Sequence, residues 1–277
     1  MAARPQTGCA DVMDPVLVSR LAAQVRAADP DRYFSALFAP SAPRPFLFAL
    51  YAFNHEVARV AETVREPMLG AIRLEWWRET VESAHKGVPR SHDVAKGLAG
   101  LFQAYPLKPG DFETLIAARA YDASAESFAD LAALENYVDA TGGTLMRLAS
   151  RILGGDPALA REPALAYGLA GLLRSLGFHN ARHKLYLPLD LLGAVGLTPD
   201  VFFELRDDPR VDAVAHQLAL RARDHFLAAR NGPRPRAGLA ALLPAALVPV
   251  YLKRLGRDVP IHRRQMALLG AAMKKRL

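Results

Sequence analysis

The amino-acid sequence predicts an all-α protein that folds as a single domain. Aspartate is followed by proline at Asp14-Pro15, Asp29-Pro30 and Asp208-Pro209. This pair is typical of a helix start, with the carboxylate at the N-cap and proline at the first helical position. The segments that follow are rich in apolar residues at helical spacing. No stretch alternates between polar and β-branched apolar residues, so we expect essentially no sheet.

Each expected helix is bounded by proline, glycine or a capping residue. The first carries Leu17, Leu21 and Val25 at helical spacing, and Gly87 is expected to follow a helix end as a C′ glycine. In chain order we expect helices that begin at Asp14 and Asp29, followed by helices over about 43–64, 67–86, 91–106, 109–123, 129–153 and 157–183. After these we expect a short helix near 191, one that opens at 198–199, a long helix over 208–230, and two final helical stretches. Ser91 is expected to cap the helix that opens there.

The segment NGPRPR (231–236) is the most loop-like stretch between helices. We interpret it as a connection, because the chain after it is too short for an independent core. The sequence therefore predicts an N-terminal segment with the first helix over residues 1–28 and one domain over residues 29–277.

The composition is that of a globular protein, with 51% hydrophobic and 23% charged residues. The single cysteine, Cys9, fits a reducing compartment and is given no role. The longest apolar stretch, 239–252, contains two prolines and is too short for a bilayer, so we expect no transmembrane segment. The sequence shows no secretory signal, and we expect a cytoplasmic protein. A formal charge of +7 favours acidic partners, but nothing resembles a nucleic-acid motif, so we expect no nucleic acid.

Four segments carry a resemblance to a known family. They are RPFLFALYAFNHEVARVAETV (44–64), LEWWRETV (74–81), YVDATGGTLMRLASRILGG (137–155) and GLAGLLRSLGFHNARHKLYLP (168–188). Their order and spacing resemble the squalene/phytoene synthase family from about Asp29 onwards. The resemblance implies a single-domain, isoprenoid-synthase-type helical bundle around a central cavity.

The resemblance also implies which residues the family's chemistry needs. Active members condense two prenyl diphosphates, and aspartates on two facing helices hold the magnesium ions that neutralise the diphosphate. In the first motif those positions are Ala58, Arg59 and Glu62 here, and in the second they are Ser175 and His179. Only Glu62 keeps a carboxylate, and Arg59 places a permanent cation where a metal ligand is expected.

Outside the metal-binding positions of the two motifs, the scaffold residues of this chain match the family pattern. An upstream asparagine and glutamine of the second motif fall on Gly171 and Gly168. Positions that match the pattern are Arg44, Tyr51, Phe53, Asp122, Tyr137, Gly143, Thr144, Arg174, Tyr186 and Pro188, of which we expect Arg44, Tyr51, Phe53, Tyr137, Arg174 and Tyr186 near the cavity. The sequence thus predicts a retained scaffold with a degenerate metal site, no catalytic residue and no cofactor.

The phrases YAFNHE (51–56) and REPMLG (65–70) resemble the branch that contains the mitochondrial assembly factor for respiratory complex I. This resemblance implies a non-catalytic assembly factor for complex I (NADH dehydrogenase), whose partner is a complex I subunit or an assembly intermediate. It also implies that the protein is peripheral on the cytoplasmic face of the inner membrane. One alternative is a prenyl-diphosphate transferase, which alone would require Mg²⁺. Another is a module that binds an isoprenoid, quinone or lipid in the cavity.

Several side chains allow two interpretations. His179 and His183 are spaced as zinc ligands on one helix face, or are polar fillers of a vacated cavity, which we favour. Glu62 either pairs with Arg59 or His179, or is exposed at the cavity mouth. One of Trp76 and Trp77 is expected in the core, with the other covering a neighbouring helix or a partner, and Gly142-Gly143 predicts a kink or a close helix approach.

Overall fold

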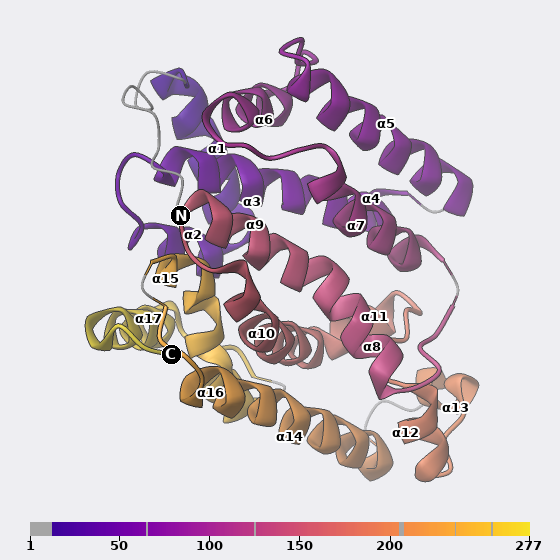
Figure 1. Ribbon diagram of the computed structural model, residues 1–277. Helices are drawn as coiled ribbons and strands as arrows, with labels where there is room; N and C mark the ends of the chain where they lie inside the picture. The colour runs from indigo at the N-terminus through magenta and orange to yellow at the C-terminus, as the bar shows by residue number, and fades with distance from the viewer. Residues whose placement is uncertain (1–12, 65, 125, 205–207, 236, 256) are drawn as a thin grey trace.

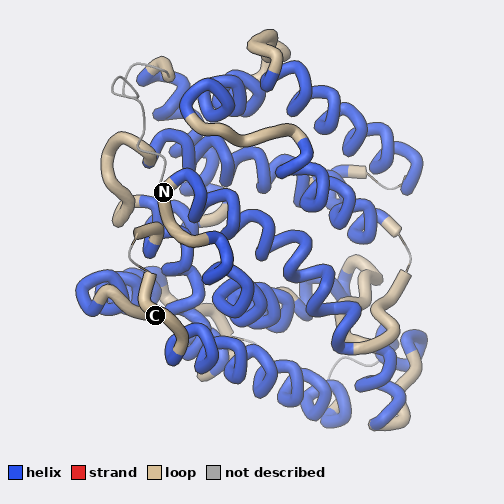
Figure 2. Tube along the Cα trace, in the orientation of Figure 1, coloured by secondary structure: helices blue, strands red, loops and turns tan. Residues whose placement is uncertain are grey.

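The computed structural model describes residues 13–277 except 65, 125, 205–207, 236 and 256. Cys9 lies outside the described residues. Within them every regular element is a helix, as Figure 2 shows, and the predicted all-α fold is confirmed. No helix in the described ranges is long and apolar enough to cross a bilayer.

The N-terminal half builds one side of the bundle around a common apolar core (Figure 1). Its helices are α1 (Pro15–Ala28), α2 (Pro30–Ala36), α3 (Arg44–Ala58), α4 (Val60–Thr63), α5 (Pro67–His85), α6 (Asp93–Ala104), α7 (Gly110–Arg119) and the 3₁₀ turn η2 (Ala120–Ala123). Helix α1 packs against α3 and α6 through the fully buried Leu21 and Val25. The first helix is thus packed into the main core, while the domain boundary at residue 29 stays a prediction.

The C-terminal half surrounds a central helix, α10 (Arg161–Arg174), which packs lengthwise against α14 (Pro209–Asn231). Its other elements are α8 (Leu131–Val138), the π-helical turn η3 (Asp139–Gly143), α9 (Thr144–Ile152), the 3₁₀ turn η4 (Pro157–Ala160), α11 (Leu176–Ala181), α12 (Leu189–Ala194), α13 (Pro199–Glu204), α15 (Leu239–Leu242), the 3₁₀ turn η5 (Leu243–Leu247), α16 (Val248–Leu252) and α17 (Ile261–Lys274).

The predicted helix starts are confirmed at the three Asp-Pro pairs. The carboxylates of Asp14, Asp29 and Asp208 accept hydrogen bonds from the backbone N–H groups two or three residues on. Gly87 adopts φ 77°, as expected after a helix end. The expected cap at Ser91 is wrong: the N-cap is His92, whose Nδ1 accepts from the Val94 N–H at 3.2 Å.

Two expected helices are each broken in two. The segment 43–64 divides at Arg59 into α3 and α4, and the segment 157–183 divides at Ser175 into α10 and α11. Both breaks fall on positions that the family resemblance assigns to metal-binding aspartates. The helices therefore end where this chain departs from the family pattern.

The glycine pair at 142–143 lies in the π-helical turn between α8 and α9, as the predicted irregularity there requires. A Cβ at Gly143 would lie 2.3 Å from Oδ1 of Asp139. A Cβ at Gly168 on α10 would lie 2.3 Å from Cγ1 of Val138 on α8. Glycine at these two positions therefore permits the close packing of α8, η3 and α10.

Candidate functional site

A cleft of about 630 Å³ opens between α4, η2, α11 and the segment that leads to α12. We call it the α4–α11 cleft. Its lining is Ala58, Ala61, Glu62, Val64, Glu66, Arg119, Asp122, Ala123, Ser124, Tyr137, Leu172, Phe178, His179, Arg182, His183, Lys184 and Tyr186. Its polar side chains come from segments far apart in the sequence, so the fold itself assembles the site.

The carboxylate of Asp122 is the centre of the cleft's hydrogen-bond network. Its Oδ1 accepts hydrogen bonds from the hydroxyls of Tyr137 (2.6 Å) and Tyr186 (2.7 Å). Its Oδ2 accepts from Nη1 of Arg119 at 3.0 Å, and the same Nη1 lies 3.0 Å from the Tyr137 hydroxyl oxygen. The Asp122 side chain is only 6% exposed. Both oxygens are therefore occupied by protein donors.

The protonation of this network follows from burial. Burial raises the pKa of Tyr137 above its ordinary value; the charge of Arg119 opposes this shift and that of Asp122 adds to it. The pKa of Tyr186 is also raised, first by burial and then by the Asp122 carboxylate. Both hydroxyls therefore keep their protons and act as donors. Arg119 stays charged, because the nearby tyrosines and Asp122 outweigh the cost of burying the guanidinium.

His179 faces the same network from α11. Its ring centroid lies 4.4 Å from that of Tyr186, and its Nδ1 has no hydrogen-bond partner within the described chain. Burial lowers the pKa of His179 to about 4, with Asp122 opposing and Arg182 assisting. The imidazole is therefore neutral near pH 7 and adds no positive charge to the cleft.

The ammonium group of Lys184 binds backbone carbonyl oxygens of the segment after α7. Its Nζ donates to the carbonyl oxygens of Tyr121 (2.7 Å), Ser124 (2.8 Å) and Glu126 (3.2 Å), and it lies 4.1 Å from the Tyr121 ring centroid. Burial lowers the pKa of Lys184, while Asp122 and Glu126 oppose the shift. Lys184 thus caps the end of η2 and fixes the wall that carries Asp122.

The first degenerate motif is divided between two pockets. Ala58 and Glu62 line the α4–α11 cleft, whereas Arg59 points to the opposite side of α3 and approaches Glu56 at 3.8 Å. Glu62 is exposed at the cleft and forms no ion pair with any described residue; only its backbone oxygen accepts a hydrogen bond, from Arg182 at 3.3 Å. Of the two alternatives for Glu62, the structure therefore supports exposure at the cleft and not a pairing with Arg59 or His179.

The second motif is also only partly gathered. His179 lines the cleft, while Ser175 forms the junction between α10 and α11, and neither Ser175 nor Gly171 is part of the lining. A Cβ at Gly171 would meet open space, in contrast to Gly168. Glycine at 171 is therefore not demanded by packing. A larger side chain fits there.

Of the family positions expected near the cavity, Tyr137 and Tyr186 line the cleft. The other four lie elsewhere. Arg44 donates to the carbonyl oxygens of Leu37 and Ala39, Tyr51 is buried near Arg32, Phe53 packs edge-to-face on Trp77 and Phe112, and Arg174 pairs with Asp31 at 3.4 Å. These side chains stabilise the walls of the bundle rather than the surface of the cleft.

The residues present do not fit a magnesium cluster. Mg²⁺ is usually bound through carboxylate oxygens together with substrate phosphates. The oxygens of Asp122 are occupied by Tyr137, Tyr186 and Arg119, and the other two carboxylates of the lining, Glu62 and Glu66, stand at exposed positions. Across the described residues no three His, Cys, Asp or Glu side chains gather as metal ligands. His179 and His183 do not lie on one helix face as the zinc alternative requires, because α11 ends at Ala181 and His183 adopts φ 51°.

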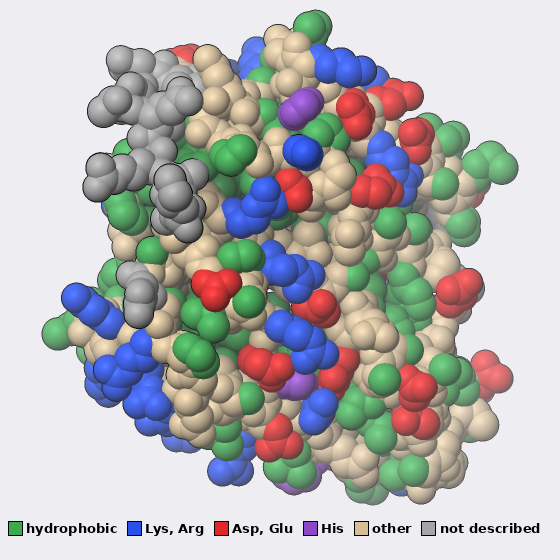
Figure 3. Space-filling view, viewed as in Figure 1, with side chains coloured by type: hydrophobic (Ala, Val, Ile, Leu, Met, Phe, Trp, Pro, Cys, Tyr) green, Lys and Arg blue, Asp and Glu red, His purple; other side chains and the backbone are tan. Residues whose placement is uncertain are grey.

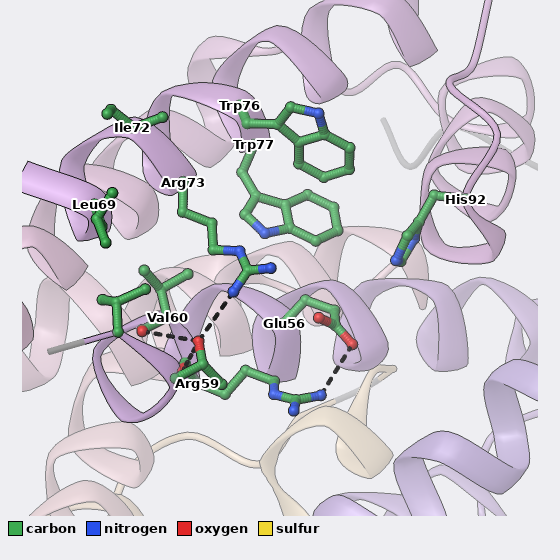
Figure 4. A pocket seen from close by; sticks show the side chains of 11 residues that line it. Glu56, Arg59, Val60, Leu69, Ile72, Arg73, Trp76, Trp77 and His92 are labelled. Atoms are coloured by element: carbon green, nitrogen blue, oxygen red, sulfur yellow. Dashed lines mark hydrogen bonds and ion pairs between the residues drawn. The ribbon is translucent and has the colours of Figure 1, made fainter.

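A second pocket of about 620 Å³ lies on the other side of α3 and α4, under α5 (Figure 4). We call it the α5 pocket. Trp76 and Trp77 form one wall, and Arg73 extends from α5 toward α4, where its Nη1 donates to Thr63 Oγ1 at 3.2 Å. Trp77 is buried and Trp76 is partly exposed, as expected. Arg73 has no carboxylate partner among the residues described.

Arg119 and Lys184 are residues of the cleft that the sequence did not indicate. Arg119 lies at the end of α7 and looked like an ordinary surface arginine. A possible signal was its i,i+3 spacing to Asp122, which is one turn of helix. Lys184 offered no signal, because its three acceptors are backbone carbonyls from residues about 60 positions earlier.

The fold and the cleft define a class: an all-α helical bundle with a polar cleft, in which the carboxylate of Asp122 is tied to two tyrosines and an arginine. The squalene/phytoene synthase family model matches residues 25–268, and the chain belongs to that family.

Relatives of two kinds are similar to it. The human "NADH dehydrogenase (ubiquinone) complex I, assembly factor 6" is 28% identical over 239 residues, which cover 84% of this chain and 72% of the human protein. A presqualene diphosphate synthase of Rhodopseudomonas palustris is 29% identical over 204 residues, covering 71% and 72%.

Solved structures of two synthases share the fold. A dehydrosqualene synthase determined with a ligand superposes with a TM-score of 0.78 at 16% identity, covering 94% of this chain and 96% of the other. A squalene synthase of Alicyclobacillus acidocaldarius gives 0.71 at 18% identity, covering 97% and 98%. The predicted isoprenoid-synthase-type bundle is thereby confirmed.

Proposed function

We propose that this protein is a non-catalytic member of the family that acts as an assembly factor for respiratory complex I. The observation that carries the proposal is the chemistry of the α4–α11 cleft. Ala58, Ser175 and His179 stand where the resemblance implies metal-binding carboxylates, and the most enclosed carboxylate of the cleft, Asp122, is saturated by protein donors. The remaining carboxylates of the lining, Glu62 and Glu66, are exposed. Such a cleft lacks the ligands for the magnesium that neutralises a diphosphate leaving group.

Sequence identity alone does not choose between assembly factor and synthase, since the two kinds of relative are 28% and 29% identical to this chain. The cleft chemistry favours the first. We infer accordingly that the protein requires no Mg²⁺ and no other cofactor for its role.

The proposed role also sets a location and a partner. We place the protein in the cytoplasm at the inner face of the respiratory membrane, bound to a complex I subunit or an assembly intermediate. The α5 pocket is the surface that we favour for this partner. Three exposed apolar side chains, Met68, Leu69 and Ile72, lie on α5 at helical spacing, and Leu69 and Ile72 line the pocket together with Arg73. An apolar segment with a carboxylate fits this combination.

Deletion of the gene tests the role. We expect the deletion strain to accumulate incomplete complex I, visible on a native gel with an NADH dehydrogenase activity stain, and plasmid-borne wild-type protein to restore the complex. Arg73→Glu combined with Ile72→Ser should fail to restore it, while the control Lys86→Glu, an exposed position outside the pocket, should succeed. A deletion strain with normal amounts of complex I would refute the proposal.

The enzyme alternative is tested separately with purified protein, Mg²⁺ and farnesyl or geranylgeranyl diphosphate. We expect no squalene- or phytoene-like product and no presqualene diphosphate. Formation of any of these with turnover would overturn the non-catalytic assignment, whatever the deletion strain shows.

The cleft still offers about 630 Å³ beside small side chains such as Ala58, Ala61 and Ala123, which is room for an apolar tail. This favours a second candidate function, the binding of an isoprenoid, quinone or lipid without turnover. Mass spectrometry of organic extracts from natively purified protein would reveal a bound lipid. An extract that matches a purified control protein would exclude it.

A further inference from the structure

The net charge of the chain is concentrated in its last 30 residues. Residues 248–277 contain eight Lys and Arg but only one acidic residue, Asp258, which is a formal charge of +7 and equals that of the whole chain. The preceding residues carry 27 basic and 27 acidic side chains and are neutral overall. The protein is therefore a neutral body with one strongly basic end, which Figure 3 shows as the Lys and Arg side chains gathered at the lower left over α17.

Helix α17 has apolar side chains on its outer side as well as on its inner side. Its inner side buries Leu268 and Ala271 against the bundle. Its outer side exposes Met266 (65%), Leu269 (42%) and Met273 (76%), which lie at i, i+3 and i+7 and form one stripe. A solvated helix rarely keeps three large apolar residues in a row on its outer face, so this stripe calls for a partner.

The basic side chains that flank the stripe have no acidic partners. Arg263, Lys274 and Lys275 on or next to α17 are exposed, and Lys253 and Arg257 lie in the connection from α16. None of them forms an ion pair within the part of the chain that the structure describes. Their charge is directed to solvent rather than used inside the molecule.

One arginine of the segment does the opposite and holds α17 in place. Arg264 donates from Nη1 to Oδ1 of the buried Asp31 at 2.9 Å, and Tyr251 and Tyr167 donate to the other oxygen of Asp31. This contact joins α17 to α2, α10 and α16, so the outer stripe is presented on a fixed support.

We propose that this face, the apolar stripe of Met266, Leu269 and Met273 with the surrounding Lys and Arg, docks on an anionic lipid bilayer. Helix α17 lies parallel to the membrane plane, its outer side chains enter the headgroup boundary, and the basic side chains contact lipid phosphates. Charge and apolar exposure coincide on one face, as an anionic bilayer requires. A nucleic acid fits less well, because its phosphate backbone offers no apolar surface to the stripe and the outer face of α17 carries no aromatic side chain for base stacking.

The proposal goes beyond the function proposed above and does not depend on it, since it rests only on the charge and the exposed apolar side chains of this end of the molecule. Its test also needs no complex I. A failure of vesicle binding therefore leaves the assembly role open, and a normal complex I in the deletion strain leaves the docking surface open.

The test is flotation of the full-length protein with vesicles on a density gradient. With equal parts phosphatidylcholine and phosphatidylglycerol at low salt we expect the protein to float, and with phosphatidylcholine alone, or at high salt, to stay at the bottom. The triple variant Arg263→Gln/Lys274→Gln/Lys275→Gln should weaken binding by about tenfold or more, because each basic residue near an anionic surface adds to the attraction. The double variant Met266→Ser/Met273→Ser should weaken it several-fold without changing the net charge.

Two matched controls distinguish this face from any charged or apolar surface. Lys86→Gln/Lys96→Gln/Lys108→Gln removes the same charge from exposed positions elsewhere, and Met68→Ser/Ile72→Ser removes exposed apolar side chains from α5. Both should bind vesicles like the wild type. Equal urea midpoints would show that all variants are folded.

Three results would overturn the proposal. One is unchanged flotation of both α17 variants, and another is equal loss in the control variants. The third is binding to duplex DNA or RNA without binding to anionic vesicles, which would assign the face to nucleic acid.

Discussion

Two buried carboxylates in this protein are surrounded by the same kinds of side chain and yet occupy very different places. Asp31 on α2 accepts hydrogen bonds from Tyr167 and Tyr251 and from Arg174 and Arg264. Asp122 in η2 accepts from Tyr137, Tyr186 and Arg119. Their side chains are 3% and 6% exposed, respectively.

The two clusters differ in whether open volume borders the carboxylate. The Asp31 carboxylate is enclosed, because four helices meet on it and two arginines offset its charge, of which Arg264 is mostly buried and Arg174 is 39% exposed at the rim. We call this the closed cluster. The Asp122 cluster has one arginine and borders a cleft of about 630 Å³. Similar partners therefore make one carboxylate an internal tie and the other the wall of a binding cleft. The types of side chain around a buried carboxylate therefore do not show whether it belongs to a binding site, whereas a cleft beside it does.

The largest expected effect is on the closed cluster. Asp31→Asn leaves Arg174 and Arg264 without their carboxylate, and breaking a buried pair of this kind costs about 3–5 kcal/mol of unfolding free energy. Urea denaturation followed by circular dichroism measures it. Glu79→Gln, which breaks the exposed pair with Arg90, is the control and should cost less than about 1 kcal/mol. Equal losses in the two variants would contradict the role of Asp31 as a tie.

A smaller loss is expected at the open cluster. Asp122→Asn removes one ion pair and weakens two hydrogen bonds, but water in the cleft can hydrate the groups left behind. We expect a cost of about 1–3 kcal/mol by the same measurement. A loss as large as that of Asp31→Asn would show that the cleft is closed in solution.

The pH dependence of stability should carry a contribution from His179. Its pKa is about 4 when folded and 6.5 in the unfolded chain, so between these values the unfolded state binds more protons. Stability is therefore full above pH 6.5 and falls as the pH drops toward 4, by an amount on the order of 1–2 kcal/mol after solvent screening. His179→Gln should flatten this part of the profile, whereas His216→Gln, at an exposed position, should not. An unchanged profile in His179→Gln would contradict its burial.

The smallest effects are expected from single hydroxyl deletions, which sharpen the comparison. Tyr251→Phe at the closed cluster should cost about 1–2 kcal/mol, because Asp31 cannot replace the lost donor. Tyr186→Phe at the cleft should cost about 1 kcal/mol or less, since water can take the place of its hydroxyl. The reverse order in urea unfolding would mean that the two clusters do not differ in access to water.

The sequence predicted those features that depend on neighbouring residues. The helix starts at Asp14, Asp29 and Asp208 need only a carboxylate and a following proline, and all three form the expected cap. The family resemblance predicted the helical bundle and pointed to Ala58, Glu62, His179, Tyr137 and Tyr186, which all line one cleft in the structure.

What the sequence could not predict depends on long separations. Asp31 looked like an ordinary acidic residue in the first turn of a helix, yet its partners Tyr167 and Arg264 are 136 and 233 residues away. Likewise, nothing local in Arg59 or Ser175 opposes a helix, so the sequence did not predict the helix breaks there.

The uneven placement of charge has one more consequence. A molecule whose body is neutral and whose end carries +7 behaves as an electric dipole near a negatively charged surface. Within roughly 8 Å, the screening length at physiological salt, the field exerts a torque that turns α17 toward that surface before contact. Helix α5 lies at the opposite corner of the molecule in Figure 1, so the same rotation turns α5 away from that surface.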